Sequence, residues 1–395
     1  MPIANFVLLL SFLSLTIWVI LLAFRGQFWR CNQLLPVLSP ESPLLKDYPA
    51  ICAVIPARNE AEVIAFSLRS LFQQSYPGSF TIVLVDDNST DNTATIAQEL
   101  AQELNKTEQL HIVSGAALPI GWSGKLWAME QGIRYAETLN QLPDYFLLTD
   151  ADIQHHSTNL YELVTKAKQE KLDLVSLMVL LRCESFWEKL LIPAFVFFFQ
   201  KLYPFPLVNN PNKSIAAAAG GCILIKRETL TQIGGIERVK QALIDDCALA
   251  AAVKNPGKIW LGLTESTCSL RPYPSLESIW DMVARTAYTQ LNYSPFLLLG
   301  TVLGMTLVYL VPPLAVIGGL LTGNLAIALP GLITWLLMAI AYFPTIKLYN
   351  CSPIFAFCLP VIALLYNLMT IDSAWRHWRG KGGAWKGRVY PSVNS

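Results

Sequence analysis

Residues 81–91 read TIVLVDDNSTD and residues 145–152 read YFLLTDAD, and in both segments a short apolar run ends in aspartates. Short runs of this kind that alternate with amphipathic stretches indicate an α/β fold. In open α/β sheets ligands bind at the carboxyl ends of the strands, so acidic residues at these ends are expected to point into one crevice. The residues concerned are Asp86, Asp87, Asp150 and Asp152.

The same alternation continues on both sides of these segments. We predict a helix at Ala61–Gln74, after Asn59 as its capping residue, and another at Thr93–Leu104, after Asp91. The predicted strands are Ile51–Pro56, Thr81–Asp86, His111–Val113, Tyr145–Thr149, Leu172–Val179 and Cys222–Lys226.

Long uncharged segments flank this predicted domain. Of the 395 residues, 53% are hydrophobic and 14% are charged, which is too little charge to cover a soluble globule of this size. The run Phe6–Phe24 can nearly cross a bilayer, and Arg25 and Arg30 follow it, so we expect an anchor with the downstream chain in the cytosol. A cleaved signal peptide is the alternative, but no basic region precedes the run.

Three further spans are predicted at about Pro295–Leu321, Leu325–Phe343 and Ile354–Ile371. Three spans after a cytosolic domain would put the tail that follows outside, whereas the basic and aromatic residues of Trp375–Tyr390 favour the cytosol. A re-entrant or interfacial segment among the three would resolve this conflict. The aromatic stretch Phe186–Pro206 predicts a helix on the membrane surface, with a buried core helix as the alternative.

These patterns predict a multi-pass protein of the cytoplasmic or bacterial inner membrane with a cytosolic domain. The expected parts are an N-terminal transmembrane anchor (1–30), a linker (31–49), the α/β domain (50–290), C-terminal transmembrane helices (291–372) and a basic aromatic tail (373–395). The net charge of +1 argues against nucleic acid as a partner. The eight cysteines contain no CxxC pair and indicate buried thiols in a reducing compartment.

The gathered carboxylates point to a metal ion. Carboxylates at one site repel one another, and a hard divalent cation such as Mg²⁺ or Mn²⁺ would offset this repulsion. The pair Asp150 and Asp152 forms a DxD motif. DxD alone is a weak signal, because a turn or a helix cap produces the same pattern. His155 and His156 could extend the metal site, but a flanking surface pair is the commoner outcome.

Six motifs in a fixed order carry a family resemblance. The segments PARNEAE (56–62), VDDNSTD (85–91), GWSGKLWAMEQG (121–132), TDAD (149–152), GGCILIKRE (220–228) and IDDCAL (244–249) resemble the family 2 inverting glycosyltransferases. More narrowly, GWSGK, ARTAYTQL (284–291) and WKGRVY (385–390) are similar to the hopanoid-biosynthesis-associated glycosyltransferases of bacteria. The resemblance covers about residues 50–290. It implies a GT-A fold, that is, a Rossmann-like nucleotide-diphospho-sugar transferase domain.

The resemblance also implies roles for single residues. The segment Pro56, Ala57, Arg58 and Glu60 would line the nucleotide pocket with Asp86 and Asp87, while Gly124 and Lys125 would approach the donor phosphates. Asp150 would contact the sugar or ribose, and Asp152 the metal. A surface ion pair with Glu60 or Glu62 is the alternative for Arg58.

The acidic pair Asp245–Asp246 matches the family's general base, and we assign the base to Asp246 with Asp245 in support. The alternative is a pair that favours a helix N-terminus through the dipole. The processive synthases of the family carry QxxRW, whereas this chain reads MVART at 282–286. Of the residues of that motif, only the arginine is present here, as Arg285, and it could hold the pyrophosphate. The departure puts polymer synthesis in doubt and favours transfer of a single sugar.

We therefore expect a membrane-bound glycosyltransferase that uses a UDP- or GDP-sugar donor, Mg²⁺ or Mn²⁺, and a lipid acceptor such as a hopanoid. One alternative is transfer to a polyprenyl phosphate, which needs no strong base because the acceptor is already an anion. An alternative of another class is a non-catalytic membrane scaffold or flippase. Release of UDP that requires a divalent metal would separate the enzyme from the scaffold.

Overall fold

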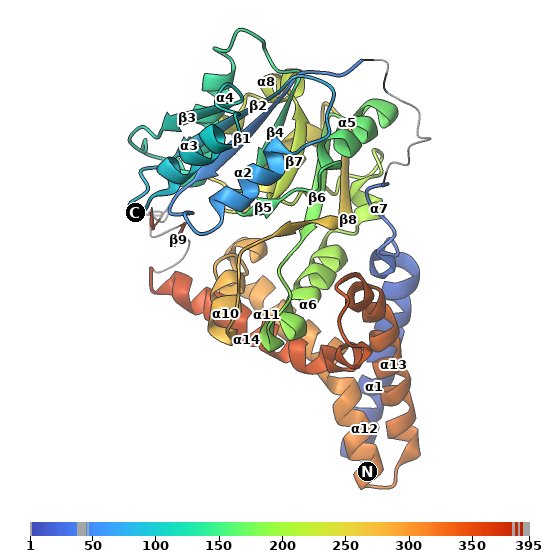
Figure 1. Cartoon of the computed structure of the whole chain (residues 1–395). Coiled ribbons are helices and arrows are strands. Elements are labelled where there is room, and N and C mark those ends of the chain that lie inside the picture. The colour runs from blue at the N-terminus through green and yellow to red at the C-terminus, as the bar shows by residue number, and fades with distance from the viewer. Residues whose placement is uncertain (1, 38–44, 46, 381–383, 386–387, 390–395) are drawn as a thin grey trace.

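The computed structural model describes residues 2–37, 45, 47–380, 384–385 and 388–389. A mixed α/β domain sits on a layer of apolar helices, from which a bundle of long helices projects (Figure 1). Residues 38–44 and 46 of the predicted linker lie outside the described residues. The same holds for the predicted tail at 381–383, 386–387 and 390–395.

In the described part of the chain, eight strands form one sheet in the order β3-β2-β1-β4-β7-β6-β8-β5. The strands β3, β2, β1 and β4 run parallel, and β7 is antiparallel to both β4 and β6. Their bounds are β1 Ile51–Ala57, β2 Phe80–Asp86, β3 Leu110–Ser114, β4 Tyr145–Thr149, β5 Ile153–Gln154, β6 Leu174–Leu180, β7 Cys222–Lys226 and β8 Ile259–Ser269.

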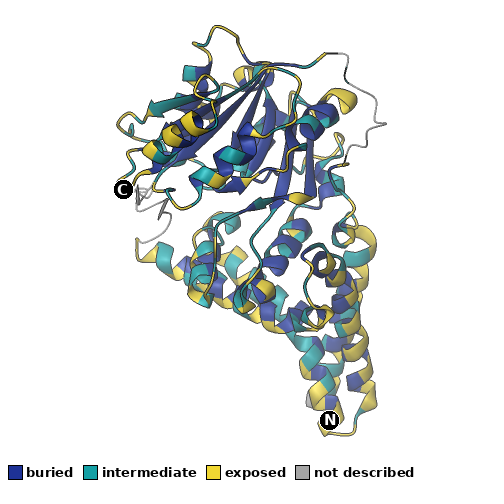
Figure 2. Cartoon of the chain, viewed as in Figure 1, coloured by how far each residue is buried: buried dark blue, intermediate teal, exposed yellow. Residues whose placement is uncertain are grey.

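Helices bury both faces of the sheet, as Figure 2 shows by the dark central strands. Along β1, Cys52 and Val54 pack into one apolar cluster, whereas Ile51, Ala53 and Ile55 pack into the other. The first cluster includes residues of α4 (Gly124–Ala136), α6 (Phe186–Leu202) and α9 (Asp245–Lys254). The second includes residues of α2 (Ile64–Phe72), α3 (Thr93–Glu103) and α5 (Asn159–Glu170).

One glycine allows α4 to lie close against the sheet. A Cβ atom at Gly132 would lie 2.5 Å from Val54 Cγ1 and 3.0 Å from Val85 Cγ2. Real Cβ contacts are not that short, so any larger residue would push α4 away from β1 and β2. The position of Lys125 in the first turn of the same helix depends on this packing.

The predicted strands are confirmed to within two residues at each end, but β5 and β8 were not predicted. The helix predicted from Ala61 begins only at Ile64, and the capping role given to Asn59 is wrong. Asn59 has φ of 52° and its side chain accepts a hydrogen bond from the Thr90 amide at 2.8 Å. It therefore ties the β1 loop to the β2 loop and does not cap a helix.

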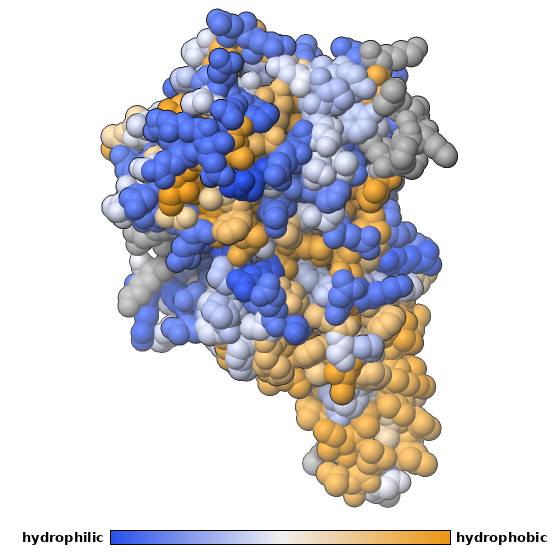
Figure 3. Space-filling model, viewed as in Figure 1, coloured by the Kyte–Doolittle hydropathy of each residue, from blue (hydrophilic) through white to orange (hydrophobic). Residues whose placement is uncertain are grey.

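Among the described residues, five helices are by length and composition able to cross a membrane: Ala4–Phe24, Phe186–Val208, Pro295–Leu321, Leu325–Leu348 and Pro353–Trp378. Of these, α1 (Pro2–Phe24), α12 (Val311–Leu321) and α13 (Leu325–Leu348) form the projecting bundle (Figure 1). Figure 3 shows an apolar surface over this bundle and a mostly polar surface over the sheet domain. Trp18 fastens α1 to the π-helical turn Thr306–Leu310, because its indole N–H donates to the Val308 carbonyl at 2.9 Å.

The remaining apolar helices lie between the bundle and the sheet. The helix α14 (Leu359–Trp378) runs obliquely beneath the sheet domain beside α10 (Leu276–Ala284) and α11 (Pro295–Met305) (Figure 1). The helix α6 is buried between these layers: Leu191, Ile192 and Phe197 are fully inaccessible to solvent. The burial of these residues agrees with the alternative of a buried helix, whereas the place of α6 at the membrane surface stays a prediction.

Candidate active site

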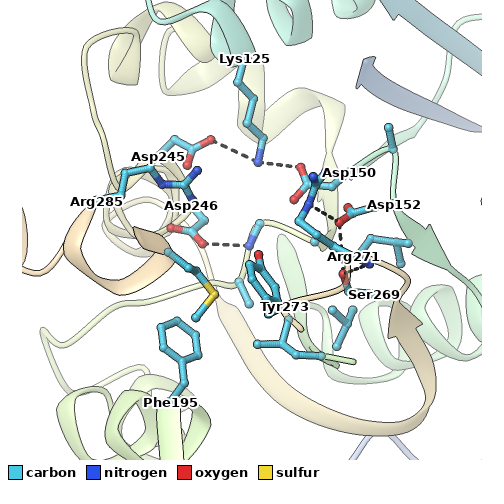
Figure 4. A pocket seen from close by; sticks show the side chains of 18 of the residues that line it. Lys125, Asp150, Asp152, Phe195, Asp245, Asp246, Ser269, Arg271, Tyr273 and Arg285 are labelled. Atoms are coloured by element: carbon cyan, nitrogen blue, oxygen red, sulfur yellow. Dashed lines mark hydrogen bonds and ion pairs between the residues drawn. The ribbon is translucent and has the colours of Figure 1, made fainter. Parts of the chain in front are cut away.

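A pocket of about 650 Å³ opens where β1 and β4 end, between the sheet and the helix layer below it. Figure 4 shows that side chains from several distant segments converge on it. Among the lining residues are many that were singled out from the sequence: Pro56, Glu60, Lys125, Asp150, Asp152, Asp245, Asp246 and Arg285.

The other predicted site residues lie behind or beside this lining. Asp87 is fully buried, and its backbone N–H donates to the Ala57 carbonyl at 2.8 Å. Arg58 donates to the Asp87 carbonyl and lies 3.9 Å from its carboxylate. Asp86 ends β2, and its Oδ1 accepts from the Ser89 amide at 3.3 Å. Gly124 opens α4 after the capping side chain of Ser123 and so places Lys125 in the pocket.

Lys125 lies between two carboxylates (Figure 4). Its Nζ is 2.6 Å from Asp150 Oδ1 and 3.8 Å from Asp245 Oδ2. Burial lowers the pKa of Lys125, but the nearby carboxylates, led by Asp150, outweigh this effect and raise the pKa above its ordinary value. The amine is therefore charged at neutral pH and can bind phosphate oxygens.

Asp246 is the carboxylate best suited to accept a proton. Its Oδ2 accepts from the Gly220 amide at 2.9 Å, and its Oδ1 accepts from the Cys247 amide at 2.7 Å. Burial, together with the charge of Asp245, raises the pKa of Asp246 to about 6, although Lys125 opposes the shift. A carboxylate with this pKa is ionised at neutral pH and is a stronger base than an ordinary aspartate.

Gly220 keeps the space between these groups open. A Cβ atom there would lie 3.4 Å from Lys125 Nζ and 3.5 Å from Asp246 Oδ2. Asp245 and Asp246 are also the first two residues of α9. They therefore lie at a helix N-terminus, as the alternative interpretation of this pair expects. This does not exclude a role in the pocket, because both carboxylates line it.

Arg271 is the main site residue that sequence reasoning missed. Its Nε donates to Asp152 Oδ2 at 2.9 Å, and its Nη2 donates to the two Glu60 oxygens at 2.8 and 3.1 Å. The Ser269 hydroxyl also donates to Asp152 Oδ2, at 3.2 Å. The apolar run Ile259–Leu263 was the available signal, because it begins the unpredicted strand β8 that leads to Arg271.

Two further arginines line the other side of the pocket. Arg285 follows the last residue of α10, and Arg376 comes from α14. Arg376 Nη1 donates to Asp281 at 2.7 Å, which joins α14 to α10. The tail residue Arg376, predicted only as part of a basic segment, therefore belongs to the pocket wall.

The wall next to α6 is largely apolar, and Met282 of α10 adds to it beside the polar Ser278 and Asp281 of the same helix. The residues that α6 contributes are Phe195 and Phe199. In Figure 4, Phe195 lies at the opposite end of the cluster from Lys125. One pocket thus joins a charged end to an apolar end that faces the helix layer.

The oxygen ligands present fit a divalent metal only if a bound substrate completes its coordination. Asp150 and Asp152 carry the hard oxygen atoms that Mg²⁺ and Mn²⁺ prefer. Within the described part of the chain, no cluster of three or more His, Cys, Asp or Glu side chains could hold a metal. The missing ligands would have to be oxygens of a diphosphate and water.

The two histidines after TDADIQ do not line the pocket. His155 is buried and lies 3.0 Å from both the Thr149 hydroxyl and the Asn159 amide nitrogen. Burial lowers the pKa of His155 to about 4, so the ring is neutral at pH 7. His156 lies 2.9 Å from the Thr158 hydroxyl. Both therefore have structural partners outside the pocket.

The mixed sheet, with the DxD carboxylates at the end of β4, has the architecture of the GT-A fold. Residues 52–234 match the family model Glycosyl transferase family 2. A mannosyltransferase from Pyrobaculum calidifontis, solved with GDP-Man and Mn²⁺, has the same fold. It superimposes with a TM-score of 0.52 at 16% identity, over 92% of this chain and 99% of its own.

Curated relatives match the domain at higher identity. The beta-monoglucosyldiacylglycerol synthase of Nostoc sp. strain PCC 7120 is 31% identical over 36% of this chain and 29% of its own. The 4,4'-diaponeurosporenoate glycosyltransferase of Staphylococcus haemolyticus is 29% identical over 32% of this chain and 31% of its own. The chain thus spans less than a third of the length of these two relatives.

Proposed function

We propose that this protein is a membrane-bound inverting glycosyltransferase that transfers one sugar from a UDP- or GDP-sugar to a membrane lipid, for example a hopanoid. One observation carries the proposal: a single pocket has Lys125 between carboxylates at one end and Phe195, Phe199 and Met282 at the other. The charged end suits a nucleotide diphosphate, and the apolar end suits a lipid.

The donor would lie along the ends of β1, β2 and β4. In this proposal Pro56, Ala57, Arg58, Glu60, Asp86 and Asp87 hold the nucleotide, Gly124 and Lys125 hold the phosphates with Arg285, and Asp150 contacts the sugar. Asp152, supported by Asp150, would hold Mg²⁺ or Mn²⁺. The metal, when bound, neutralises charge on the leaving diphosphate. The solved mannosyltransferase complex contains GDP-Man and Mn²⁺, which supports a donor and a metal of this kind.

Asp246 would act on the acceptor. The acceptor hydroxyl attacks the anomeric carbon, its proton passes to Asp246, and the sugar–phosphate electron pair leaves with the diphosphate. Lys125 and Arg285 stabilise the charge that develops on the leaving group. Attack from the face opposite the diphosphate inverts the anomeric configuration.

The lipid would enter from the membrane side of the pocket. The helices α6 and α10 lie between the sheet domain and the apolar bundle, so their side chains can meet an acyl or polycyclic chain near the bilayer surface (Figures 1 and 3). The two relatives described above are named for a glucosyldiacylglycerol and for diaponeurosporenoate, which supports a lipid-like acceptor. Arg25 and Arg30 after α1 favour a cytosolic sheet domain.

A polyprenyl phosphate is the second candidate acceptor. The observation that favours it is that Arg376 and Arg285 line the same side of the pocket. Two guanidinium groups suit an acceptor phosphate. The two acceptors differ in their need for a base: a hydroxyl needs Asp246, whereas a phosphate does not.

The test is transfer of label from radioactive UDP- and GDP-sugars into the organic phase by the full chain in detergent with membrane lipids. The proposal predicts a labelled lipid that requires Mg²⁺ or Mn²⁺. Absence of labelled lipid with every donor, despite nucleotide binding, would favour the scaffold or flippase. Acid lability of the product would identify a polyprenyl phosphate acceptor.

The apolar wall offers a sharper test of the lipid acceptor. We predict that Phe195→Ala raises the KM for the lipid about tenfold and leaves the KM for the donor unchanged, because a buried phenyl ring contributes roughly 1.5–3 kcal/mol. Phe66→Ala is the matched control, since Phe66 is 60% exposed on α2. An equal rise in both KM values for Phe195→Ala would argue against a separate lipid subsite.

A further inference from the structure

Arg271 is bonded to the carboxylate to which we assign the metal. The side chains of Asp152 and Glu60 are each only 8% exposed, and both bind the one guanidinium group. A carboxylate buried without a counter-charge is costly, so two nearly buried carboxylates that share one guanidinium group are stabilised by it. Without a bound metal, Arg271 is the cation in direct contact with Asp152 among the described residues.

We propose that Arg271 is a positioning residue that competes with a divalent metal ion for Asp152; the inference rests on the metal role proposed for this aspartate. Asp152 Oδ2 already accepts hydrogen bonds from Arg271 Nε and the Ser269 hydroxyl. A metal ion at this oxygen repels the guanidinium and displaces it. The two hydrogen bonds to Glu60 then retain Arg271 in the pocket, where a diphosphate is a suitable new partner.

This competition makes metal binding depend on the donor. The free protein balances its acidic pair with Arg271, so it has little need for a metal ion. A nucleotide diphosphate brings negative charge and oxygen ligands that can satisfy both the metal and the displaced guanidinium. Metal and donor are therefore expected to bind together. Without a donor, the pocket is expected to bind the metal weakly.

The experiment measures binding of Mn²⁺ alone to the full chain in detergent, from the loss of the electron paramagnetic resonance signal of free Mn²⁺. Arg271→Gln removes the competing charge and leaves Asp152 facing Glu60, so it should bind Mn²⁺ about tenfold more tightly than the wild type. Arg69→Gln is the matched control, because Arg69 pairs with exposed Glu103 away from the pocket. The control should retain the wild-type affinity for Mn²⁺.

The double variant Asp152→Asn with Arg271→Gln locates the effect and should lose the gain in affinity. If Arg271→Gln does not fold, Arg271→Lys is used; one ammonium cannot reproduce the planar contacts to both carboxylates, so a smaller gain is expected. Wild-type or weaker affinity in the folded Arg271 variant overturns the inference, and so does a gain that persists without Asp152. Because no donor or acceptor is present, failure of sugar transfer in a separate assay would overturn the proposed function alone.

Discussion

Two backbone amides, from Gly220 and Cys247, donate to the two oxygens of the Asp246 carboxylate, so an asparagine of similar size would keep only one of these hydrogen bonds. We predict that Asp246→Asn lowers turnover with a hydroxyl acceptor about 100- to 10,000-fold, the usual contribution of a general base. Affinity for the donor should change little, because the donor is assigned to Lys125, Arg285 and the DxD pair.

Asp245→Asn is the companion variant in the same transfer assay. Its carboxylate is 3.8 Å from Lys125 and supports the charge balance without bonding to Gly220, so a smaller loss is expected. Full activity of Asp246→Asn, together with loss in Asp245→Asn, would move the base back by one residue. Full activity of both variants would favour the polyprenyl phosphate acceptor.

The pH dependence of transfer follows from the same carboxylate. The charged groups that act on Asp246 are Asp245 in α9 and Lys125 in α4, and the backbone amides of Cys247 and Gly220 donate hydrogen bonds to it. Because the pKa of Asp246 is raised to about 6, it gains a proton below that pH and can no longer accept one. We predict that kcat/KM falls about tenfold per pH unit below about pH 6.

Donor binding, measured as a thermal shift at each pH, should stay nearly constant over the same range and serves as the control. Asp246→Asn should lack this acid limb in its residual activity. A wild-type rate that is unchanged down to pH 5 would contradict the assignment of the base.

Among the elements, the start of α6 is held by several hydrogen bonds to one side chain, that of Glu188. Glu188 is 1% exposed, and its carboxylate accepts from the backbone amides of Glu184, Ser185 and Tyr273 at 2.9, 2.8 and 2.7 Å. The bond from the Ser185 amide belongs to a capping box, whose other half is the bond from the Glu188 amide to the Ser185 hydroxyl at 3.2 Å. The bond from the Tyr273 amide ties α6 to the loop that carries Arg271 from β8 to α10.

We predict that Glu188→Ala lowers the free energy of unfolding by about 2 kcal/mol or more, because it leaves buried amides without their acceptor. The same change should raise the KM for the donor by loosening the loop at Arg271. Glu184→Ala is the control and should cost less than about 0.5 kcal/mol, since Glu184 forms an exposed pair with Arg182. Equal denaturation midpoints for the two variants would refute the role of Glu188.

The sequence predicted the elements whose signals are local. The strands β1, β4 and β7 are short apolar runs that are buried along nearly their whole length, and β2 is an apolar run buried over its central residues, so composition and length identify them. The strand β8 was missed because its second half, TESTCS, is polar and partly exposed. The extent of burial of α6 could not be predicted, because an aromatic apolar helix suits a membrane surface and a protein interior equally well.

The candidate site divides in the same way. Lys125, Asp150, Asp152 and Asp246 stand in ordered motifs and could be named from the sequence. Arg271, Arg376 and Phe195 stand in no motif and reach the pocket only because β8, α14 and α6 meet there. Their contribution depends on tertiary packing, which no local pattern encodes.

At the scale of the whole molecule, the arrangement of the helices is compatible with a cytosolic C-terminus, which stays a prediction because the helix Pro353–Trp378 is also long and apolar enough to cross a membrane. The bundle contains α1, α12 and α13, whereas α14 lies beneath the sheet domain, and β9 (Ala384–Trp385) lies beside that domain (Figure 1). If only the bundle crosses the bilayer, α12 and α13 form a return pair and the tail is on the same side as the catalytic domain. In that arrangement α14 is the interfacial segment that would place the basic tail in the cytosol.

We predict that a reporter fused to the C-terminus is active in the cytosol and that one fused before α1 is active outside it. The basic tail should add about 1 kcal/mol of attraction to anionic headgroups for each Lys or Arg near the surface. A reporter inserted at Gly323, between α12 and α13, is the control and should report the outside. A C-terminal reporter active only outside would mean that α14 also crosses the membrane.

The central claim is that one pocket couples cleavage of a nucleotide sugar to glycosylation of a membrane lipid. The most direct measurement compares, in one reaction of the purified full chain, the nucleotide diphosphate released with the sugar recovered in lipid. We predict equal amounts of the two products, no appreciable release without lipid, and loss of both in Asp246→Asn. Release of nucleotide diphosphate at the same rate with and without lipid, or with no sugar in the lipid fraction, would contradict the account.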